Sequence, residues 1–489
     1  MTKTASLLLD VGGQSVMGLV LDDQARTCVE SRRTLETSER GDRVELHPEQ
    51  VLGAVKDVVE EALAALDAAA APALLRAALA VQRGSILCWD RETGAALSPV
   101  LSWRDRRSLP RMAHSSEQAE EIRRRTGVRF SPYAGAPKIA WCLKELPAVR
   151  AAADQGRLVC GPLGSFLLAH LVEGGPLHVD HTLAQRSLLW SRRAFDWDPW
   201  LLERFGLPAG ILPEVTPSRY SYGRLRTGSG GLTRHPPPEL QVELMMGDQN
   251  CLPFIDGHPD PDTLYINLGT GAFVLRPLRE PVDDARFQCT LLDEKNGGLW
   301  ALEGSVHGAA SALNWLEREH GVHLAHERWH ELSQTVSNPP LFLNSIDGLG
   351  SPWWRPGPKA AFHPLEDSAD HSDQALLLAV LESMAFLIRA NVEAMAEQVP
   401  NPKRIVVCGG LSRSDALCSL LADVLHCNLQ RLEAVEGTAL GLWCRLQGQT
   451  LPAPYFKPIG FKTDSALDQR YRHWLALIDR AAAPVDPPR

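Results

Sequence analysis

A short polar cluster near the middle of the chain, Gly247-Asp248-Gln249-Asn250, presents a carboxylate and two amides in succession. The apolar run 244–246 precedes it, so we expect the Asp248 side chain to lie at the rim of a cleft rather than on an open surface. A carboxylate in such a place can accept the proton of a substrate hydroxyl as that hydroxyl attacks phosphorus. Because Gly-Asp is also common in turns, an ordinary turn is the better interpretation of the cluster taken alone.

Two glycine-rich turns each join a pair of predicted strands. Gly12-Gly13-Gln14 lies between strands expected at 5–9 and 16–21, and a similar pair of strands encloses Gly269-Thr270-Gly271. Paired glycines let backbone N–H groups converge on an anion such as a phosphate, although each turn in isolation is better explained as a plain hairpin. One such turn in each half suggests a duplicated architecture in which the two turns face each other across a nucleotide.

A third glycine pair, Gly409-Gly410, stands between a predicted strand at 404–408 and a predicted helix at 414–425. This order places backbone N–H groups and a helix N-terminus beside a ligand. As a single signal it is weak.

Two side chains could bind substrate hydroxyls. Arg83 follows an apolar strand predicted at 77–81, and its planar guanidinium suits hydroxyl acceptors. Tyr133 lies in a Pro/Gly-rich stretch and could stack on a small ligand or bind it by a hydrogen bond. A solvated arginine and an ordinary loop aromatic are the alternatives. The charges from Arg104 to Arg107 are better interpreted as a solvated cluster.

The composition narrows the class of protein. A chain of 489 residues exceeds one compact core, so two domains are expected and three remain open. A net charge of -9 argues against nucleic-acid or anionic-membrane partners, and it allows a homodimer without requiring one. The ten cysteines have no metal-binding spacing and fit a reducing cytoplasm. The first residues are too short for a signal peptide, and we find no apolar run long enough to predict a membrane span.

Taken in order, these motifs resemble the FGGY carbohydrate kinases, and among them the glycerol-kinase-like branch. The resemblance runs from about Leu7 to Leu446. The glycine turns are weak matches individually. The specific elements are Trp103-Arg-Asp-Arg-Arg107, Asp180-x-Thr182 with Arg186, and Gly247-Asp-Gln249.

The resemblance implies an α/β fold of the actin-like ATPase type, with two ribonuclease H-like domains and a cleft for nucleotide and substrate between them. On this basis we predict an N-terminal, acceptor-binding domain at 1–250 and a C-terminal, nucleotide-binding domain at 251–480, followed by a tail at 481–489. The helix predicted at 435–445 is the last core helix that we expect.

The activity implied by the resemblance is transfer of the γ-phosphoryl group of ATP, with Mg²⁺, to a hydroxyl of a small polyol or sugar. Asp248 matches the family's catalytic base, and Asp10 matches the acidic residue near Mg²⁺, acting through water. The residues that match acceptor-binding positions are Arg83, Tyr133, Asp248, Gln249 and Phe273. Those that match nucleotide-binding positions are Gly12, Gly13, Gln14, Gly269, Thr270, Gly271, Asn314, Gly410 and Ser414.

Two departures from the family pattern keep other functions open. Gly84 stands where glycerol kinases have Glu, which removes an acceptor for a substrate hydroxyl. Met17 stands where the family has Arg or Lys just after the first turn, which removes a cation from the phosphates. The alternatives are therefore glycerol kinase proper and a regulator of the same fold that binds sugar or nucleotide without catalysis.

Overall fold

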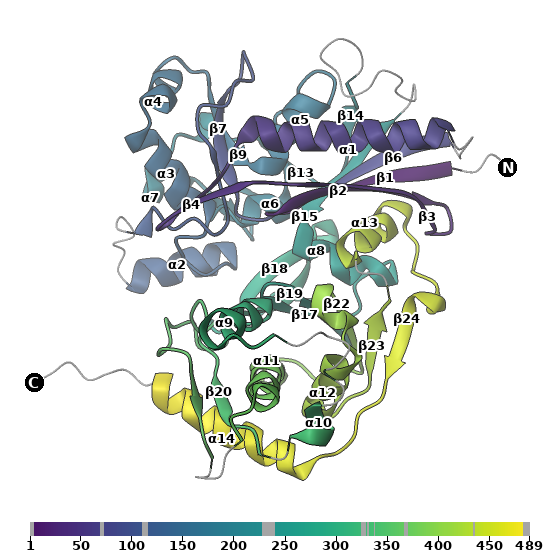
Figure 1. Cartoon of the computed structure of the whole chain (residues 1–489). Coiled ribbons are helices and arrows are strands. Elements are labelled where there is room, and N and C mark those ends of the chain that lie inside the picture. The colour runs from purple at the N-terminus through teal and green to yellow at the C-terminus, as the bar shows by residue number, and fades with distance from the viewer. Residues whose placement is uncertain are drawn as a thin grey trace, which may run out of the picture. The chain divides into compact units, whose positions relative to one another are not determined.

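The computed structural model describes residues 4–68, 73–109, 116–226, 240–323, 329, 332–336, 338–365, 370–433 and 436–482. The chain folds into two compact units, each assembled from several segments (Figure 1). Unit 1 comprises Met1–Pro259, Cys289–Trp300 and Thr438–Leu451, and unit 2 comprises Asp260–Gln288, Ala301–Gly437 and Pro452–Arg489. The domain boundaries predicted from the sequence stay predictions. Within the predicted tail, residues 483–489 lie outside the described residues.

Unit 1 is built on a six-stranded mixed sheet of order β14-β15-β6-β1-β2-β3. Its strands are β1 (Thr4–Val11), β2 (Ser15–Asp22), β3 (Thr27–Thr34), β6 (Ala73–Val81), β14 (Arg219–Arg224) and β15 (Gln241–Gly247). The central strands read as continuous apolar runs because both faces of the sheet are covered. Helix α1 (Pro48–Ala68) packs against β2 and β3 on one face (Figure 1).

A second sheet in unit 1 has the order β4-β5-β8-β7-β9. Its strands are β4 (Thr37–Arg40), β5 (Arg43–Leu46), β7 (Ile86–Asp90), β8 (Val100–Leu101) and β9 (Leu158–Pro162). The helices of this unit are α2 (Ser116–Thr126), α3 (Gly135–Glu145), α4 (Pro147–Asp154), α5 (Leu163–Leu171), α6 (His181–Gln185), α7 (Pro199–Phe205), α8 (Asp248–Cys251) and α13 (Gly437–Gln447). Two small sheets pair β10 (His178–Asp180) with β13 (Glu214–Thr216) and β11 (Trp190–Ser191) with β12 (Asp196–Trp197).

A seven-stranded sheet has the order β18-β19-β17-β16-β22-β23-β24. Its strands are β16 (Thr263–Leu268), β17 (Ala272–Leu278), β18 (Gln288–Asp293), β19 (Leu299–Val306), β22 (Arg404–Cys408), β23 (Leu429–Leu432) and β24 (Phe456–Ile459). The helices of unit 2 are α9 (Ala310–His320), α10 (Leu332–Thr335), α11 (Asp373–Ala396), α12 (Asp415–Leu425) and α14 (Ser465–Ala482), and β20 (Leu341–Leu343) pairs with β21 (Ala361–His363). Short 3₁₀ helices span Ala209–Ile211, Leu252–Asp256, Lys295–Gly297, Gly410–Arg413 and Ala453–Tyr455.

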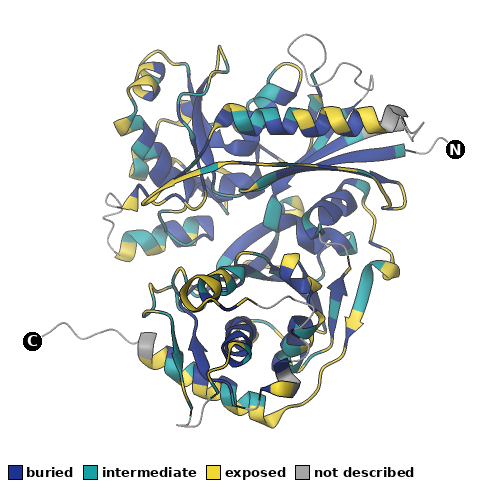
Figure 2. Ribbon diagram, viewed as in Figure 1, coloured by how far each residue is buried: buried dark blue, intermediate teal, exposed yellow. Residues whose placement is uncertain are grey.

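Helix α11 is the central core helix of unit 2. It is long and apolar enough to cross a membrane by length and composition, but 89% of its most apolar 18-residue window is buried inside the protein. Figure 2 shows the part of the helix that faces the viewer mainly in the colour of buried residues, and 18 of its residues are buried. Its apolar surface is therefore satisfied by protein contacts, as in the core helix of a soluble domain.

Helix α14 was not predicted from the sequence, so the prediction that the last core helix ends at 445 was wrong. Tyr471, Trp474 and Ile478 of α14 are buried at helical spacing. Arg470 forms a buried ion pair with Glu382 of α11. The charged residues between these positions conceal the apolar stripe when the sequence is scanned by composition.

The interpretation of Arg104 to Arg107 as a solvated cluster was wrong for half of its members. Asp105 is fully buried, accepts the N–H of Val44 at 2.7 Å and pairs with Arg107, which is itself buried. Arg104 and Arg106 remain exposed and pair with carboxylates of the β4–β5 hairpin region. The buried pair anchors the loop that follows β8.

Gly441 of α13 tests how closely the helices of unit 1 are packed. A Cβ added there would lie 2.1 Å from the carbonyl oxygen of Cys251 in α8. We expect Gly441→Ala to lower the free energy of unfolding by about 1–3 kcal/mol, because backbone must move. Gly53→Ala in α1 is the control, since a Cβ at this position meets nothing within 4 Å. The control should gain about 0.5–1 kcal/mol. Urea denaturation of both variants measures the difference, and equal stabilities would contradict the packing.

Candidate active site

Three parallel strands of unit 1 end at the same edge of the sheet. The register pairs Val11 of β1 with Val81 of β6, and Val81 with Gly247 of β15. The residues that follow these strands are the Gly12-Gly13-Gln14 turn, Arg83 and Asp248. Polar residues beyond the carboxyl ends of parallel strands form the binding sites of α/β sheets. The structure thus brings together three candidates that lie up to 236 positions apart in the sequence.

Asp248 is held by the side chain of Arg83. The Arg83 Nε lies 3.7 Å from the Asp248 Oδ1, and the Arg83 Nη1 donates to the Asn250 Oδ1 at 3.2 Å. The two ion-pair side chains are 8% and 22% exposed, so Asp248 keeps a path to solvent while Arg83 is nearly enclosed. Gly247 makes this possible, because a Cβ there would lie 2.7 Å from the Arg83 stem. Gln249 also contacts Asp248, through its backbone N–H at 2.8 Å.

A buried hydrogen-bond chain fixes the backbone just before Asp248. The Thr182 hydroxyl donates to the Asp180 Oδ2 at 2.7 Å and accepts the Gly247 N–H at 2.8 Å. Ser218 donates to the same carboxylate at 2.8 Å. Complete burial raises the pKa of Asp180 to about 6, and the hydrogen bonds from Thr182 and Ser218 oppose that rise. The Asp180-x-Thr182 element therefore orients the strand end that carries Asp248.

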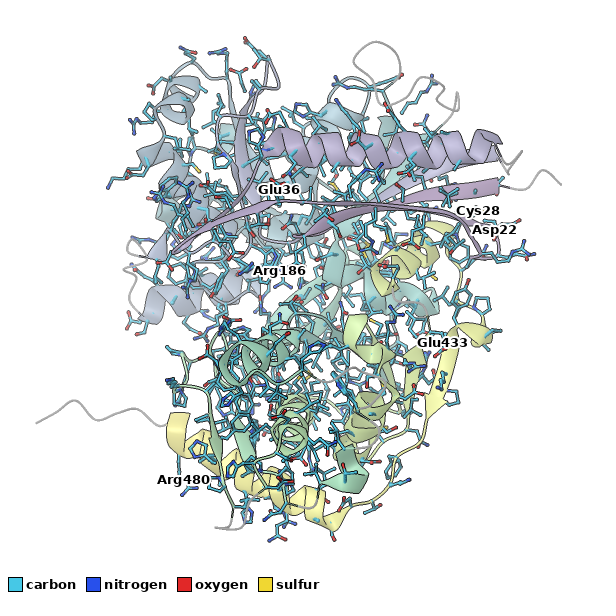
Figure 3. All side chains as sticks on the ribbon, in the orientation of Figure 1. Asp22, Cys28, Glu36, Arg186, Glu433 and Arg480 are labelled. Atoms are coloured by element: carbon cyan, nitrogen blue, oxygen red, sulfur yellow. The ribbon has the colours of Figure 1, made fainter. Side chains whose placement is uncertain are left out.

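Arg186, labelled in Figure 3, secures a returning segment of unit 1. Its Nη2 donates to the Thr290 hydroxyl at 2.6 Å. The adjacent Gln185 donates to the Cys289 carbonyl and accepts the Leu291 N–H. Asn250, next to the catalytic candidate, donates to the Leu291 carbonyl at 2.6 Å. Residues 289–291 thus support the Asp248 segment through Asn250, in addition to the bond from Gly247 to Thr182.

The first glycine turn is a tight hairpin closed by its own backbone. The Gly12 N–H donates to the Ser15 carbonyl at 3.0 Å, and the Leu35 N–H donates to the Gln14 carbonyl at 2.8 Å. Gln82, which sequence reasoning missed, donates to the Gly12 carbonyl at 3.0 Å and so ties this turn to the end of β6. The apolar strand that runs directly into Gln82-Arg83 is the signal that could have identified it.

Burial and the negative charges of Asp10, Asp248 and Asp180 raise the pKa of the enclosed Cys251 thiol in α8. Mg²⁺ is held in such sites by one or two carboxylates together with waters and phosphate oxygens. Among the described residues no group of three or more His, Cys, Asp or Glu side chains could form a complete metal cage. The donor set fits a Mg²⁺ ion that arrives with a nucleotide.

Gly84, Trp103 and Tyr133 lie on three loops beside Arg83. Tyr133 was predicted to bind the acceptor, whereas Trp103 was not predicted. Both rings are exposed, at 38% and 41%. Gly84 lies between their backbones with φ +75°, and a Cβ there would lie 3.2 Å from the Tyr133 carbonyl and 3.6 Å from the Trp103 Cβ. A tryptophan among charged residues was the available signal. Exposed aromatic rings beside an arginine suit a polyhydroxylated ligand.

Lys138 of α3 fastens these loops together. Its Nζ lies 3.0, 2.7 and 2.8 Å from the carbonyl oxygens of Gly84, Ser102 and Tyr133. The side chain is fully buried. Burial lowers the pKa of Lys138 to about 7, and the Asp105 carboxylate opposes this in part. Sequence reasoning missed this residue, although a lysine inside an apolar helical stretch was a visible signal.

In unit 2 the second glycine turn lies beside the Gly409-Gly410 pair. Strand β16 pairs in parallel with β22, so Leu268 and Gly409 follow neighbouring strand ends. Gly409 has φ +92°, and a Cβ there would lie 2.5 Å from the Leu268 carbonyl. The first N–H groups of α9 donate to the carbonyls of Gly269 and Thr270 at 3.2 and 3.1 Å. This unit therefore gathers both glycine elements and a helix N-terminus.

The other candidates of unit 2 occupy different positions on this frame. Asn314 is exposed on α9, three residues after Ser311, whose N–H donates to the Thr270 carbonyl. The Ser414 hydroxyl caps α12 by accepting the Leu417 N–H at 3.3 Å, so its side chain already has a structural role. Phe273 lies on β17 opposite Asn267. It belongs to unit 2, whereas Arg83, Tyr133 and Gln249 belong to unit 1.

Phosphoryl transfer needs little covalent chemistry from the protein and depends on positioned groups that stabilise charge and accept a proton. The carboxylate held by Arg83 at the end of β15 and the glycine hairpins suit a phosphotransferase. Comparison with family models identifies the family within this class. The N-terminal domain of the FGGY family of carbohydrate kinases matches residues 5–233, and the C-terminal domain of that family matches residues 264–444. The chain belongs to the FGGY family of carbohydrate kinases, as the order of its motifs predicted.

Relatives of known function agree with this assignment. The chain is 31% identical to a glycerol kinase of Rhodospirillum rubrum over 89% of this chain and 88% of the relative, and 34% identical to one of Methylobacterium nodulans over 81% and 80%. The structure matches Plasmodium falciparum glycerol kinase with ADP at a TM-score of 0.86 and 19% identity, covering 99% of both chains. It also matches a xylulose kinase of Lactobacillus acidophilus at a TM-score of 0.83 and 17% identity, covering 98% and 97%.

These findings confirm the predicted two-part α/β fold and the predicted enzyme class. The protein is a phosphotransferase that uses ATP and has an alcohol group of a polyol or sugar as acceptor. The structural matches, all below 25% identity, bear on the fold alone.

Lys138→Met should impair binding of the acceptor but not binding of the nucleotide. Loss of one donor shared by three carbonyls loosens the loops of Gly84, Trp103 and Tyr133, so we expect the KM of the acceptor to rise about 10-fold while the KM of ATP changes little. The free energy of unfolding should fall by about 3 kcal/mol. Steady-state kinetics with each substrate varied in turn measure the split, and an equal rise in both KM values would contradict it.

The same variant has a pH signature. Between about pH 7 and 10.5 the unfolded chain keeps a proton on Lys138 that the folded protein has released. The unfolding free energy of the wild type relative to Lys138→Met should therefore rise with pH across this window. Thermal unfolding of both proteins at several pH values provides the measurement, and a difference that is constant with pH would show that Lys138 does not titrate there.

Proposed function

We propose that this protein transfers the γ-phosphoryl group of ATP to a hydroxyl of a small polyol or sugar, with Asp248 as the general base. The observation that carries the proposal is the Asp248 carboxylate at the end of β15, held 3.7 Å from the Arg83 guanidinium and 22% exposed. In this reaction Asp248 accepts the hydroxyl proton as the acceptor oxygen bonds to the γ-phosphorus. The bond from the γ-phosphorus to the bridging oxygen breaks, and its electrons leave with ADP.

The residues proposed to bind the acceptor are Arg83, Trp103, Tyr133, Gln249 and Phe273. The nucleotide is proposed to bind the glycine turns at Gly12–Gln14 and Gly269–Gly271, with Asn314, Gly410 and Ser414. Asp10 is proposed to face Mg²⁺ through water. The fixed hydrogen-bond chain from Asp180 to Gly247 supports this assignment, because phosphoryl transfer depends on positioning rather than covalent help.

We infer that the acceptor is larger than glycerol. Gly84 has no side chain where glycerol kinases have Glu, and its φ of +75° disfavours any larger residue there. The exposed rings of Trp103 and Tyr133 border that position. Glycerol itself is the second candidate, favoured by the glycerol kinases to which this chain is 31% and 34% identical.

We further propose that the protein is cytoplasmic and that it can form a homodimer. The ten cysteines form no disulfide, and most are buried, which supports a reducing compartment.

The acceptor can be found by measuring ADP release from Mg-ATP with glycerol, erythritol, ribitol, xylitol, xylulose and ribulose. We expect one sugar or longer polyol to exceed glycerol in kcat/KM, because Gly84 leaves a hydroxyl of glycerol without an acceptor. A clear preference for glycerol would identify a glycerol kinase and overturn the inference from Gly84. If ADP is released with none of these acceptors although ATP still binds, a regulator without catalysis would be favoured.

Asp248→Asn tests the general base with the best acceptor from that panel. The amide keeps the shape and the contact with Arg83 but accepts no proton, so kcat should fall by about 10²–10⁴-fold. Asp154→Asn, on an exposed position at the end of α4, is the matched control and should keep full activity. Circular dichroism establishes that both variants are folded. Near-normal turnover by Asp248→Asn would refute the proposed role.

A further inference from the structure

Three parallel strands of unit 2 end at one edge of its sheet. Strand β22 pairs in parallel with β16 on one side and with β23 on the other. The second glycine turn, the Gly409-Gly410 pair and Glu433 follow these three strands in turn. Neighbouring strands lie about 4.8 Å apart, so the ends of β16 and β23 are separated by about 10 Å. This separation is comparable to the distance from the phosphates of a nucleotide to its base.

A cavity of about 150 Å³ lies at the ends of β22 and β23. The residues that line it are Ser412, Arg413, Arg431, Leu432 and Glu433. A cavity of about this volume holds a six-membered aromatic ring. All but one of the lining residues are polar or charged, which suits a flat heteroaromatic ring with polar edges better than an apolar ligand. The cavity can therefore receive a nucleobase.

The loop after β22 presents one side of this cavity. The Ser412 N–H and hydroxyl both donate to the Gly409 carbonyl, at 3.1 and 2.7 Å, and so fix the loop. The next residue, Arg413, is exposed, and its side chain forms no hydrogen bond or ion pair with the residues that the structure describes. A guanidinium stacks well on the face of an aromatic ring. Arg413 can thus cover one face of a base in the cavity.

The other side of the cavity carries Glu433, which is labelled in Figure 3. The Arg431 Nε and Nη2 both donate to the Glu433 Oε1, at 3.0 and 2.8 Å. The Arg431 Nη1 is held in turn by Asp415 of α12 and by the Ser412 carbonyl. The Arg431 side chain is 11% exposed and the Glu433 side chain 46%. The carboxylate is therefore anchored at Oε1, while no donor among the described residues contacts Oε2.

One open carboxylate oxygen matches one hydrogen-bond donor on a base. Adenine presents its exocyclic amine as a donor, whereas guanine and hypoxanthine have a carbonyl oxygen at the same position. Two acceptors that face each other remain unpaired, which costs free energy. Guanine could use its neighbouring N–H donors only with both oxygens of a carboxylate, and Arg431 already occupies Oε1 of Glu433. The site thus favours adenine.

We propose that Arg413 and Glu433 form a base subsite in which Arg413 stacks on the purine and the Glu433 Oε2 accepts a hydrogen bond from the exocyclic amine of adenine. The subsite selects adenine nucleotides over inosine and guanine nucleotides, and Arg431 is the positioning residue for Glu433. This inference rests on the proposed function, because it concerns the base of the same nucleotide whose phosphates are assigned to the glycine turns.

Binding experiments test the subsite without turnover. Calorimetry on the full-length protein with Mg²⁺ would compare ADP with inosine diphosphate (IDP) for wild type, Glu433→Gln and Asp415→Asn. We expect wild type to bind ADP about 10- to 100-fold more tightly than IDP, which is the value of one hydrogen bond to a charged group. Glu433→Gln should abolish most of this preference, because its amide can donate to the carbonyl of hypoxanthine. Asp415→Asn removes a different partner of Arg431 and should keep the preference within about 2-fold.

Arg413→Gln provides the second test. Loss of the stacking cation should weaken ADP and IDP alike, by about 3- to 10-fold, and leave their ratio unchanged. Equal binding of ADP and IDP by wild type, a preference that survives Glu433→Gln, equal effects of Glu433→Gln and Asp415→Asn, or normal affinities in Arg413→Gln would each overturn the inference.

Failure of this inference and failure of the proposed function give different results. A protein that selects ADP through Glu433 but phosphorylates no acceptor would retain the base subsite and lose the proposed function. An active kinase that binds ADP and IDP equally would keep the proposed function and lose the base subsite.

Discussion

The common ending of β1, β6 and β15 is the constraint on which the site depends. Parallel strands in register deliver the residues after Val11, Val81 and Gly247 to one edge of the sheet. A slip by one residue would move every side chain of a strand to the opposite face of the sheet and would break the packing on both faces. The hydrophobic core therefore sets the position of the glycine turn, Arg83 and Asp248 relative to one another. No local sequence signal connects these three segments.

Buried polar groups refine what the sheet positions. Asp180 and Lys138 are both fully buried, and each joins several segments through hydrogen bonds rather than one. Burial of an ionisable group costs free energy unless it is bonded on all sides. Asp180 is satisfied by hydroxyls and backbone N–H groups, and Lys138 by three carbonyls. That cost is the physical reason why these loops have one arrangement, and a single arrangement is what positioning catalysis requires.

In unit 2 a glycine, rather than a buried ionisable group, brings the ligand-binding candidates together. The two glycine elements of this unit lie together because Gly409 has no side chain: a Cβ at this position would lie 2.5 Å from the Leu268 carbonyl oxygen at the end of β16. The carbonyls of the second turn accept the first N–H groups of α9, which orients the helix N-terminus. The buried α11 supports this frame from within. Each unit thus presents a glycine hairpin on a rigid support.

The sequence by itself determined the elements and the family. Apolar runs predicted the strands that enclose both glycine turns, observed as β1, β2, β16 and β17, because strand periodicity is a local property. The order of short motifs predicted the FGGY family, and both family models confirm it. Two predictions from local patterns were wrong. Helix α14 was missed because charged residues interrupt its apolar stripe, and the Asp105–Arg107 pair was assigned to a solvated cluster although it is buried.

Only the tertiary structure decided which residues act together. Gln82 and Lys138 gained their roles from partners 70 and 54 positions away, and Trp103 from Gly84, 19 positions before it. The segments Cys289–Trp300 and Thr438–Leu451 return to unit 1 without any signal in their composition. Arg32 and Arg33 are adjacent and chemically identical, yet strand pairing turns one toward α1 and the other toward Asp10. Side-chain direction depends on register, and register is settled by non-local packing.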